Sequence, residues 1–350
     1  MQFKRSGNLK KTIVTFLLIV AAVTFFTFPI PYYIEGPGGA MDVDPMIHIE
    51  GEVPTENGTY MMTTISIQKA TPFTFFKSYL PFYDRLTEEE VFGQMGSFDE
   101  YLTLQQYYMN SSQHAAIQAA FEASDLPSEI MFHGVHVMTV DKQSDFYDQL
   151  HPGDIIVSID GESFEGSQDF IDKISTKEVG DQIDVSFERN GQTMDASGKL
   201  IFLEETGKPG IGISLVDHTD LETTPKTTID AGAVGGPSAG FMFSLRIYTL
   251  LNDLSLSEDY QIAGTGTIDT DGNVGRIGGI DKKIVAADEE GATIFLAPDD
   301  EITDEMREAI PEIESNYEEA VRVAKAIGTD MKVIPIKHLQ DGIDYVESLP

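Results

Sequence analysis

The sequence predicts an α+β protein that begins with a transmembrane helix, and three patterns lead to this fold class. Residues 12–32 are almost entirely apolar. Residues 105–123 repeat apolar side chains at helical spacing, without an internal glycine or proline. Residues 128–203 contain short alternating segments separated by turn residues, a pattern typical of strands. Together these patterns predict a body of mixed helices and strands with a smaller β-rich unit.

Length and charge limit the size class and the partners of the chain. Its 350 residues suggest two or three domains, and a hydrophobic content of 41% suffices for ordinary cores. The net charge is −35, and four of the 23 basic residues precede residue 12, which leaves 19 against 58 acidic ones. Such an acidic body repels nucleic acid and anionic lipid. The composition therefore argues against a nucleic-acid partner.

The apolar run Thr12–Pro31 has about the twenty residues that a helix needs to cross a bilayer. A cleaved signal peptide is the alternative. The length of the run, the absence of Ala-x-Ala near its end, and an aromatic pair suited to the membrane interface, Tyr32 and Tyr33, favour an uncleaved anchor. We therefore expect this segment to hold the protein to membrane lipid by one helix.

The charges that flank the run predict a single-pass topology in the cell membrane, with the N-terminus in the cytoplasm and the body outside. Basic residues precede the run and acidic residues follow it: Lys4, Arg5, Lys10 and Lys11, then Glu35, Asp42 and Asp44. The absence of cysteine fits this exported location and excludes cysteine nucleophiles and thiolate metal sites. No G-x-x-x-x-G-K-[ST] pattern occurs, so we expect no ATP-binding loop of this kind.

The β-rich unit resembles a PDZ domain in the order of its segments. A strand Gly134-Val-His-Val-Met-Thr-Val140 is followed by the turn Leu150-His-Pro-Gly-Asp154, the strand 155–159, a helix near 168–174 and the strand 182–188. The alternative is another small β-rich domain. PDZ domains bind an extended peptide as an added strand. The resemblance implies that Phe132, His133, Gly134 and Val135 form the carboxylate loop, and that Val135 and Val137 belong to the groove strand.

The segment Asp230-Ala-Gly-Ala-Val-Gly-Gly-Pro-Ser-Ala-Gly240 is the first candidate for chemistry. An apolar, helix-like run follows it. A serine at a helix start lies where backbone N–H groups converge and where the helix dipole favours an oxyanion. Taken alone, the segment is equally compatible with a phosphate-binding or merely tight turn. A serine nucleophile needs a base, so the candidate depends on a partner elsewhere in the chain.

A second segment supplies such a partner: Ile262-Ala-Gly-Thr-Gly-Thr, followed by Ile277-Gly-Gly-Ile-Asp-Lys-Lys-Ile-Val-Ala-Ala287. The pair closely resembles the protease domain of the Lon family, with its G-P-S-A-G, T-G and I-G-G-[LI]-x-x-K-x-x-A-A elements in order. The resemblance implies that Ser238 is the nucleophile, Lys283 the general base, and Thr265 the hydroxyl that orients the lysine amine. Lys282 is the adjacent competitor. The two lysines project about 100° apart on a helix, so only one can face the site.

A lysine can act as a base only if burial lowers its pKa from about 10.4 toward neutrality. Neighbouring apolar side chains are expected to provide that burial. Backbone N–H groups of Ser238 and of Gly235 or Gly236 are the expected oxyanion hole, since Pro237 has no N–H. The chain departs from many Lon proteases at Gly235, where an acidic residue is common. Asp269–Asn273 is expected to be a hairpin turn rather than a calcium loop, so no metal and no cofactor are predicted.

The full arrangement resembles the membrane-anchored, PDZ-containing Lon-like proteases of Gram-positive bacteria. The expected divisions are 1–11 (basic tail), 12–32 (span), 33–127 (first part of the protease domain), 128–203 (PDZ domain inserted into it) and 204–350 (catalytic core). The implied function is ATP-independent serine endopeptidase activity on peptides or on small membrane or secreted proteins. A catalytically silent PDZ scaffold is the alternative from another class. A histidine-based hydrolase is the third hypothesis. It is disfavoured because no histidine lies between residues 219 and 337.

Overall fold

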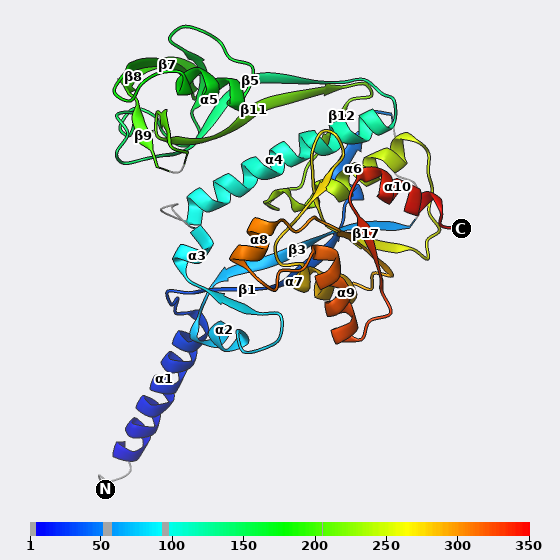
Figure 1. Ribbon diagram of the computed structural model, residues 1–350. Helices are drawn as coiled ribbons and strands as arrows, with labels where there is room; N and C mark the ends of the chain where they lie inside the picture. Colours follow the sequence, from blue (N-terminus) through cyan, green and yellow to red (C-terminus); the bar gives the residue numbers. More distant parts are fainter. Residues whose placement is uncertain (1–4, 52–57, 93–97, 205) are drawn as a thin grey trace.

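The computed structural model describes residues 5–51, 58–92, 98–204 and 206–350. Figure 1 shows three parts: an N-terminal helix, a central body that includes one long helix, and a smaller unit set apart from the body alongside that helix. A two-stranded ribbon joins the body to the smaller unit. Each part has its own sheet or helix, and the body holds the residues of both Lon-like motifs.

The body is built on a six-stranded mixed sheet with the order β17-β16-β13-β3-β1-β4. β1 runs antiparallel to β3 and β4, whereas β3, β13, β16 and β17 are mutually parallel neighbours. The strands are β1 Tyr33–Asp42, β3 Thr59–Lys69, β4 Asp84–Leu86, β13 Gln261–Gly264, β16 Ile294–Pro298 and β17 Lys332–Ile336. The inner parallel strands β13 and β16 are buried on both faces, which agrees with their apolar sequences.

Helices cover both faces of this sheet, and the alternation of side chains along β3 shows how. Tyr60 and Met62 belong to the core beneath α4 and α6, whereas Met61 belongs to the core beneath α7 and α9. The α-helices of the body are α2 Pro72–Lys77, α3 Glu88–Phe92, α4 Phe98–Ala123, α6 Gly240–Leu251, α7 Ile280–Glu289, α8 Asp304–Ala309, α9 Asn316–Ile327 and α10 Leu339–Glu347. The two layers bring α7 and α6 to opposite faces of one sheet.

Short elements complete the body and connect the parts. They are the 3-10 helices η1 Asp44–Met46 and η2 Pro237–Ala239, and the strands β2 Ile47–Ile49, β12 Thr227–Ile229, β14 Thr267–Ile268 and β15 Val274–Gly275. β14 and β15 pair antiparallel, so residues 269–273 between them form the expected hairpin turn. Among the described residues no cluster of His, Asp or Glu could hold a metal ion.

The smaller unit is a five-stranded sheet with the order β11-β5-β6-β7-β8, packed against α5 Ser167–Ser175. Its strands are β5 Ser128–Val140, β6 Ile155–Ile159, β7 Gln182–Arg189, β8 Gln192–Lys199 and β11 Ile213–Thr223, with the small pair β9 Ile201–Leu203 and β10 Lys208–Gly210 beside them. β11 pairs with β5 from Ile213 to Thr223. The sheet therefore extends past residue 203, and β11 lies in it rather than in the catalytic core to which the sequence assigned it.

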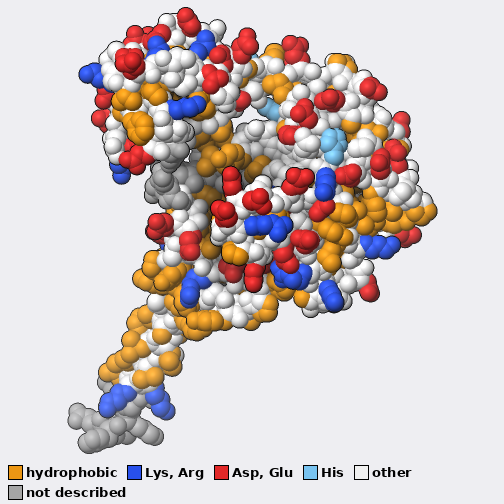
Figure 2. Space-filling view, viewed as in Figure 1, with side chains coloured by type: hydrophobic (Ala, Val, Ile, Leu, Met, Phe, Trp, Pro, Cys, Tyr) orange, Lys and Arg blue, Asp and Glu red, His pale blue; other side chains and the backbone are white. Residues whose placement is uncertain are grey.

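The N-terminal helix α1, Arg5–Thr27, projects from the body. Its segment Leu9–Thr27 is long and apolar enough to cross a membrane, and a signal sequence would have the same properties. Figure 2 shows hydrophobic side chains along this helix. The helix ends before Pro29, as proline disfavours helical geometry at the residue before it. Tyr33 is not at the surface, as an interfacial residue would be, but is buried against Phe92 in the first strand of the sheet.

Candidate active site

Ser238, Thr265 and Lys283 come together between the two helical layers. The Lys283 Nζ lies 2.7 Å from the Ser238 Oγ and 2.8 Å from the Thr265 Oγ1. Ser238 lies in η2, Thr265 directly follows β13, and Lys283 lies in the first turns of α7. An amine within hydrogen-bond distance of a serine hydroxyl has the geometry of a nucleophile and its base. The sequence-predicted trio is thus one contiguous set of side chains.

The turn that presents Ser238 is held from two sides. Gly236 has a φ of 87°, a conformation that favours glycine, and it leads into Pro237. On one side the Ser112 Oγ of α4 donates to the Pro237 carbonyl at 2.9 Å. On the other, the Gly266 N–H and the Thr265 Oγ1 donate to the Ser238 carbonyl at 2.8 and 2.9 Å. These bonds fix the backbone of Ser238, and Thr265 therefore links the serine to the lysine.

Ser112 is a supporting residue that the sequence reasoning did not identify. It lies three residues after Met109 and four before Ala116, and both of those side chains are buried. A hydroxyl at helical spacing on an otherwise apolar face is a signal that could have marked it. Ser112 also explains why residue 240 is a glycine, because a Cβ at that position would lie 2.4 Å from the Ser112 Oγ.

Lys283 has the environment that a lysine base requires. Its side chain is 2% exposed, and burial lowers the pKa of Lys283 to about 7. The apolar residues Ile280 and Ile284 on the same helix are buried as well. α7 begins after Gly279, whose φ of 66° is left-handed and therefore suits glycine. Near neutral pH a large fraction of the amine is unprotonated and able to accept a proton.

Lys282 is buried too, but its surroundings are the opposite of those of Lys283. Its Nζ lies 2.6 Å from a carboxylate oxygen of Asp84 and 3.3 Å from one of Glu35. A third carboxylate, that of Asp281, lies at 3.3 Å. Burial opposes the charge of this lysine, but the three carboxylates outweigh that effect and raise the pKa of Lys282. Lys282 therefore remains charged and ties α7 to β1 and β4.

One of the expected oxyanion donors is already engaged. The Gly236 N–H donates to the Gln105 carbonyl of α4 at 2.8 Å, so it is unavailable to an oxyanion while this bond exists. The Cβ that Gly235 lacks would lie 2.8 Å from the Gln105 Cβ, which shows how closely α4 covers this loop. The structure therefore differs from the expectation that the Gly236 N–H is free to bind an oxyanion, because a residue distant in the chain accepts this N–H. The N–H groups of Gly235 and Ser238 remain the candidates.

The peptide groove of the smaller unit also differs from the expectation. Gly134 to Val137 lie in β5, which is paired with β11 on one side and, at Val135 and His136, with β6 on the other. An interior strand has no free edge for an added peptide. A Cβ added at Gly134 would lie 2.4 Å from the Ile156 carbonyl oxygen, so this position does not border open space. The backbone of this segment is thus occupied within the sheet.

The other residues of the expected carboxylate loop are engaged as well. Phe132 packs against Phe164, and the His133 Nε2 lies 3.1 Å from a carboxylate oxygen of Asp220. The sheet edge that contacts α5 is β11, and the Ser167 N–H at the start of α5 donates to the Asp217 carboxylate of β11. An added strand would therefore lie along β11. The sequence reasoning placed this segment in the catalytic core instead, because its pairing partner β5 is far away in the chain.

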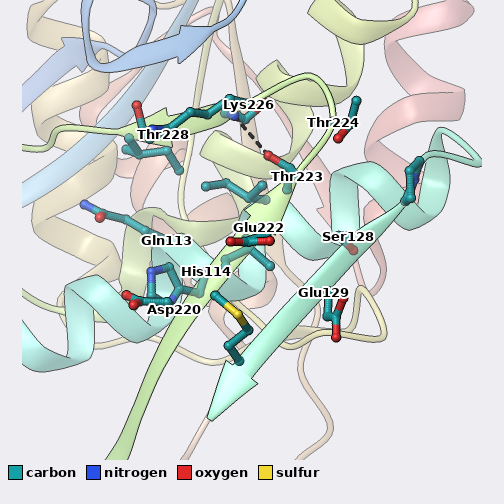
Figure 3. Close-up of a pocket in the computed structure, with 16 residues that line it drawn as sticks. Gln113, His114, Ser128, Glu129, Asp220, Glu222, Thr223, Thr224, Lys226 and Thr228 are labelled. Atoms are coloured by element: carbon teal, nitrogen blue, oxygen red, sulfur yellow. Dashed lines mark hydrogen bonds between the residues drawn. The ribbon is translucent and has the colours of Figure 1, made fainter. Parts of the chain in front are cut away.

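A cavity of about 760 Å³ lies apart from the Ser238–Lys283 pair, at the base of the β5–β11 ribbon (Figure 3). α4 contributes Gln113 and His114 to its wall, and the strands contribute acidic and threonine side chains. His114 is held by Thr219 at 3.1 Å, and burial lowers the pKa of this histidine. The cavity contains neither Ser238 nor Lys283, so its volume does not identify the site of chemistry.

Thr265→Val is expected to lower kcat about 10- to 100-fold, because a hydrogen bond to a charged group is worth roughly 1.5–3 kcal/mol. The change removes the oxygen that contacts Lys283 and the donor to the Ser238 carbonyl. Cleavage of a fluorescently labelled unfolded protein measures the effect. Thr63→Val is the matched control, because Thr63 is equally buried and its hydroxyl, within the described part of the chain, donates only to the Gly264 carbonyl. An unchanged kcat in Thr265→Val would show that Thr265 does not contribute to catalysis.

Comparisons with known proteins match both halves of this arrangement. A profile of the Lon protease (S16) C-terminal proteolytic domain matches residues 222–345, and a PDZ domain profile matches residues 106–200, which include most of α4. The chain is 29% identical over 125 residues to a Lon protease of Endomicrobium trichonymphae and 30% identical over 112 residues to one of Rickettsia typhi. These matches cover 35% and 31% of this chain, and the chain spans 14% of the length of each relative.

Solved structures with similarity to the chain include two PDZ domains. One, from an SdrC-like protein of Listeria monocytogenes, is 41% identical, with a TM-score of 0.24, and the match covers 25% of this chain and 93% of that one. The other, from an SdrC-like protein of Listeria innocua, is also 41% identical, with a TM-score of 0.23, over 24% of this chain and 96% of that one.

Proposed function

Because this chain belongs to the PDZ-containing Lon-like proteases, we propose that it is a serine endopeptidase with Ser238 as nucleophile and Lys283 as general base. The observation that supports this assignment most strongly is the 2.7 Å separation of the Lys283 Nζ and the Ser238 Oγ, at a lysine whose burial lowers its pKa to about 7. A base poised near the working pH is what proton transfer requires.

The proposed reaction uses Lys283 twice. The neutral amine accepts the Ser238 proton as the Oγ attacks the scissile carbonyl, and the resulting ammonium then protonates the leaving amine. The acyl-enzyme is hydrolysed by a water molecule that the same amine deprotonates. Thr265 holds the amine in place through the 2.8 Å contact. Backbone N–H groups of Gly235 and Ser238 are the proposed stabilisers of the oxyanion, with no cofactor or metal.

The proposed setting is the outer face of the cell membrane. Leu9–Thr27 forms the span, the basic residues before it remain in the cytoplasm, and the catalytic body is outside. The reaction is proposed to be independent of ATP, in agreement with the absence of a G-x-x-x-x-G-K-[ST] sequence. Its substrates are peptides or small membrane or secreted proteins, positioned as an added strand along β11 beside α5.

A catalytically silent PDZ scaffold is the second candidate, and one contact favours it. The bond from the Gly236 N–H to the Gln105 carbonyl occupies a backbone donor next to the nucleophile. Cleavage through an oxyanion hole that includes Gly236 would need this bond to break. The two candidates differ in what they require of Ser238. A protease needs the Ser238 hydroxyl, whereas a scaffold would keep its function without it.

The test compares peptides released into the medium by cells that carry the wild-type chain or Ser238→Ala. A protease at the outer face releases a set of peptides that Ser238→Ala does not, and the ends of those peptides give the cleavage sites. Ser244→Ala is the matched control, because Ser244 is buried in α6 and its Oγ has no hydrogen-bond partner among the described residues. Identical peptide sets from wild-type and Ser238→Ala cells would support the scaffold instead.

A further inference from the structure

We propose that residues 72–83, here called the α2 patch, form a second membrane contact beside α1 and lie in the interface of the same bilayer. The α2 patch comprises α2 and the turn after it. The partner is a lipid surface, with acyl chains meeting the aromatic side chains. The proposal rests on the proposed membrane anchoring by α1 and extends it, because a single helix leaves the body free to tilt.

The α2 patch exposes large apolar side chains that the body does not cover. Phe76 is 60% exposed, Tyr79 is 72% exposed, and Phe73 and Leu80 are also exposed. These four side chains lie within eight consecutive residues, whereas none of the residues of α2 is buried. Contiguous exposed apolar surface of this kind is unusual on a soluble face and marks a protein or membrane contact.

The position of the α2 patch selects the membrane as the occupant. Phe73 packs against Phe25 and Phe26 in the last turn of α1, with ring centroids 6.2 and 4.8 Å apart. Phe76 also contacts Phe25, at 6.2 Å. The apolar surface is therefore continuous with that of the helix proposed to span the bilayer, and it lies at the end where the helix leaves the lipid (Figures 1 and 2). Aromatic side chains are enriched at this depth.

Backbone contacts fix this arrangement. The Ile30 N–H donates to the Ala70 carbonyl, and the Ala70 N–H donates to the Tyr32 carbonyl, each at 2.8 Å. Thr71 then caps α2 by a reciprocal pair of bonds with Thr74. The chain that leaves α1 and the chain that enters α2 are thus joined directly. A bilayer that receives the end of α1 meets α2 without any rearrangement of the body.

The charges of the region suit a lipid headgroup layer, in contrast to the rest of the acidic body. The α2 patch contains one lysine, Lys77, and no acidic residue, whereas Lys69 just before it forms an ion pair with Glu88 at 3.3 Å. The Lys77 Nζ lies over the Tyr83 ring, 5.4 Å from its centroid. Lysine stems extend along apolar surface while the ammonium reaches the phosphate layer. Within residues 72–83, therefore, no carboxylate opposes contact with an anionic lipid surface.

The membrane contact has a consequence for the site. β1 follows α1 directly, and its Glu35 forms an ion pair with Lys282, the neighbour of Lys283. A bilayer that binds both α1 and the α2 patch therefore fixes the orientation of the sheet that supports α7, the helix that carries Lys283. The active site is held at a constant height, where exposed segments of membrane-bound substrates can reach it.

The chain contains no tryptophan, so one introduced tryptophan is a unique fluorescent probe. Three Phe→Trp variants of the full chain are matched in exposure: Phe76→Trp in the α2 patch (60%), Phe16→Trp in α1 (63%) and Phe202→Trp in β9 of the PDZ unit (57%). Each is reconstituted into vesicles of phosphatidylcholine and phosphatidylglycerol, with and without brominated phosphatidylcholine. Tyr79→Trp is a second probe of the patch, and circular dichroism verifies folding.

We expect brominated chains to quench Phe16→Trp and Phe76→Trp but to leave Phe202→Trp unchanged. Bromine placed near the headgroup end of the acyl chain is expected to quench Phe76→Trp most strongly, because interfacial segments lie about 5–10 Å deep. Quenching of Phe16→Trp alone, with Phe76→Trp and Tyr79→Trp as bright as Phe202→Trp, overturns the patch and leaves the span intact. Loss of quenching at Phe16→Trp as well overturns the span, and the patch with it.

Discussion

Ser238→Ala is expected to lower kcat/KM for an unfolded protein or peptide substrate by about 10⁴- to 10⁶-fold, the order of magnitude expected when a member of a catalytic set that includes the nucleophile is removed. The Ser238 Oγ is the atom proposed to form the acyl-enzyme, and a water molecule in its place would lack both covalent catalysis and the fixed position next to Lys283. Binding should change little, because the hydrogen bonds that hold the turn are accepted by the backbone carbonyls of Pro237 and Ser238, which the substitution keeps.

Ser244→Ala serves as the control, with the same substitution in the helix that follows the nucleophile. Its Oγ is buried and bonds to no polar atom in the part of the chain that the structure describes, so the change should keep activity and leave the stability equal or slightly higher. Steady-state cleavage and thermal unfolding of both variants give the comparison. A Ser238→Ala protein that cleaves at the wild-type rate would exclude the serine mechanism, whereas loss of activity in both variants would indicate a damaged fold.

The catalytic segments could be predicted from the sequence because their information is local. The Lon-family pattern, counted from Gly279, selects Lys283 as the lysine that faces the serine, and a rotation of about 100° around the helix separates it from Lys282. β6 and α5 likewise match the segments that turn residues and alternation predicted. The family comparisons confirm the predicted combination of a PDZ domain with a Lon-type proteolytic domain. The catalytic roles of Ser238, Thr265 and Lys283 stay predictions until the variants are measured.

The features that were missed depend on contacts between distant parts of the chain. Nothing near Gly236 in the sequence indicates that Gln105 of α4 accepts its N–H. The peptide groove was placed on β5 because its sequence has the PDZ pattern, but the strand order puts β11 at the edge. Strand pairing is set by long-range partners rather than by propensity, so a correct strand can have an unpredicted neighbour.

Lys283→Met is expected to reduce kcat/KM about 10²- to 10⁴-fold, the usual contribution of a general base. Methionine has a similar length and no proton to exchange, so the pocket stays filled. In the wild-type protein kcat/KM should rise with pH through about 7 and then level off, because the neutral amine is the active form and burial lowers the pKa of Lys283 to about 7. The variant should lack this rise. A wild-type profile that is flat from pH 6 to 9 would contradict the assignment of Lys283 as the base.

The same substitution should stabilise the fold, which separates loss of function from loss of structure. Because the pKa of Lys283 is about 7 when folded and about 10.4 when unfolded, the unfolded chain binds more protons between these values. The contribution of Lys283 to the free energy of unfolding of the wild-type protein therefore rises with pH across this window. Each pKa unit corresponds to about 1.4 kcal/mol. Lys283→Met should thus exceed the wild type in stability by a few kcal/mol at pH 7, and the difference should shrink toward pH 10.

Lys282→Met is the matched control, and its expected effects have the opposite signs. It removes the cation shared by Glu35, Asp84 and Asp281, so the free energy of unfolding should fall. The loss should be smaller than the roughly 3–5 kcal/mol for breaking a fully buried pair, because Asp84 is largely exposed. Cleavage per folded molecule should remain near the wild-type level. Urea unfolding and active-site titration of the two variants decide the assignment: if Lys282→Met instead gained stability and lost cleavage, the roles of the two lysines would be exchanged.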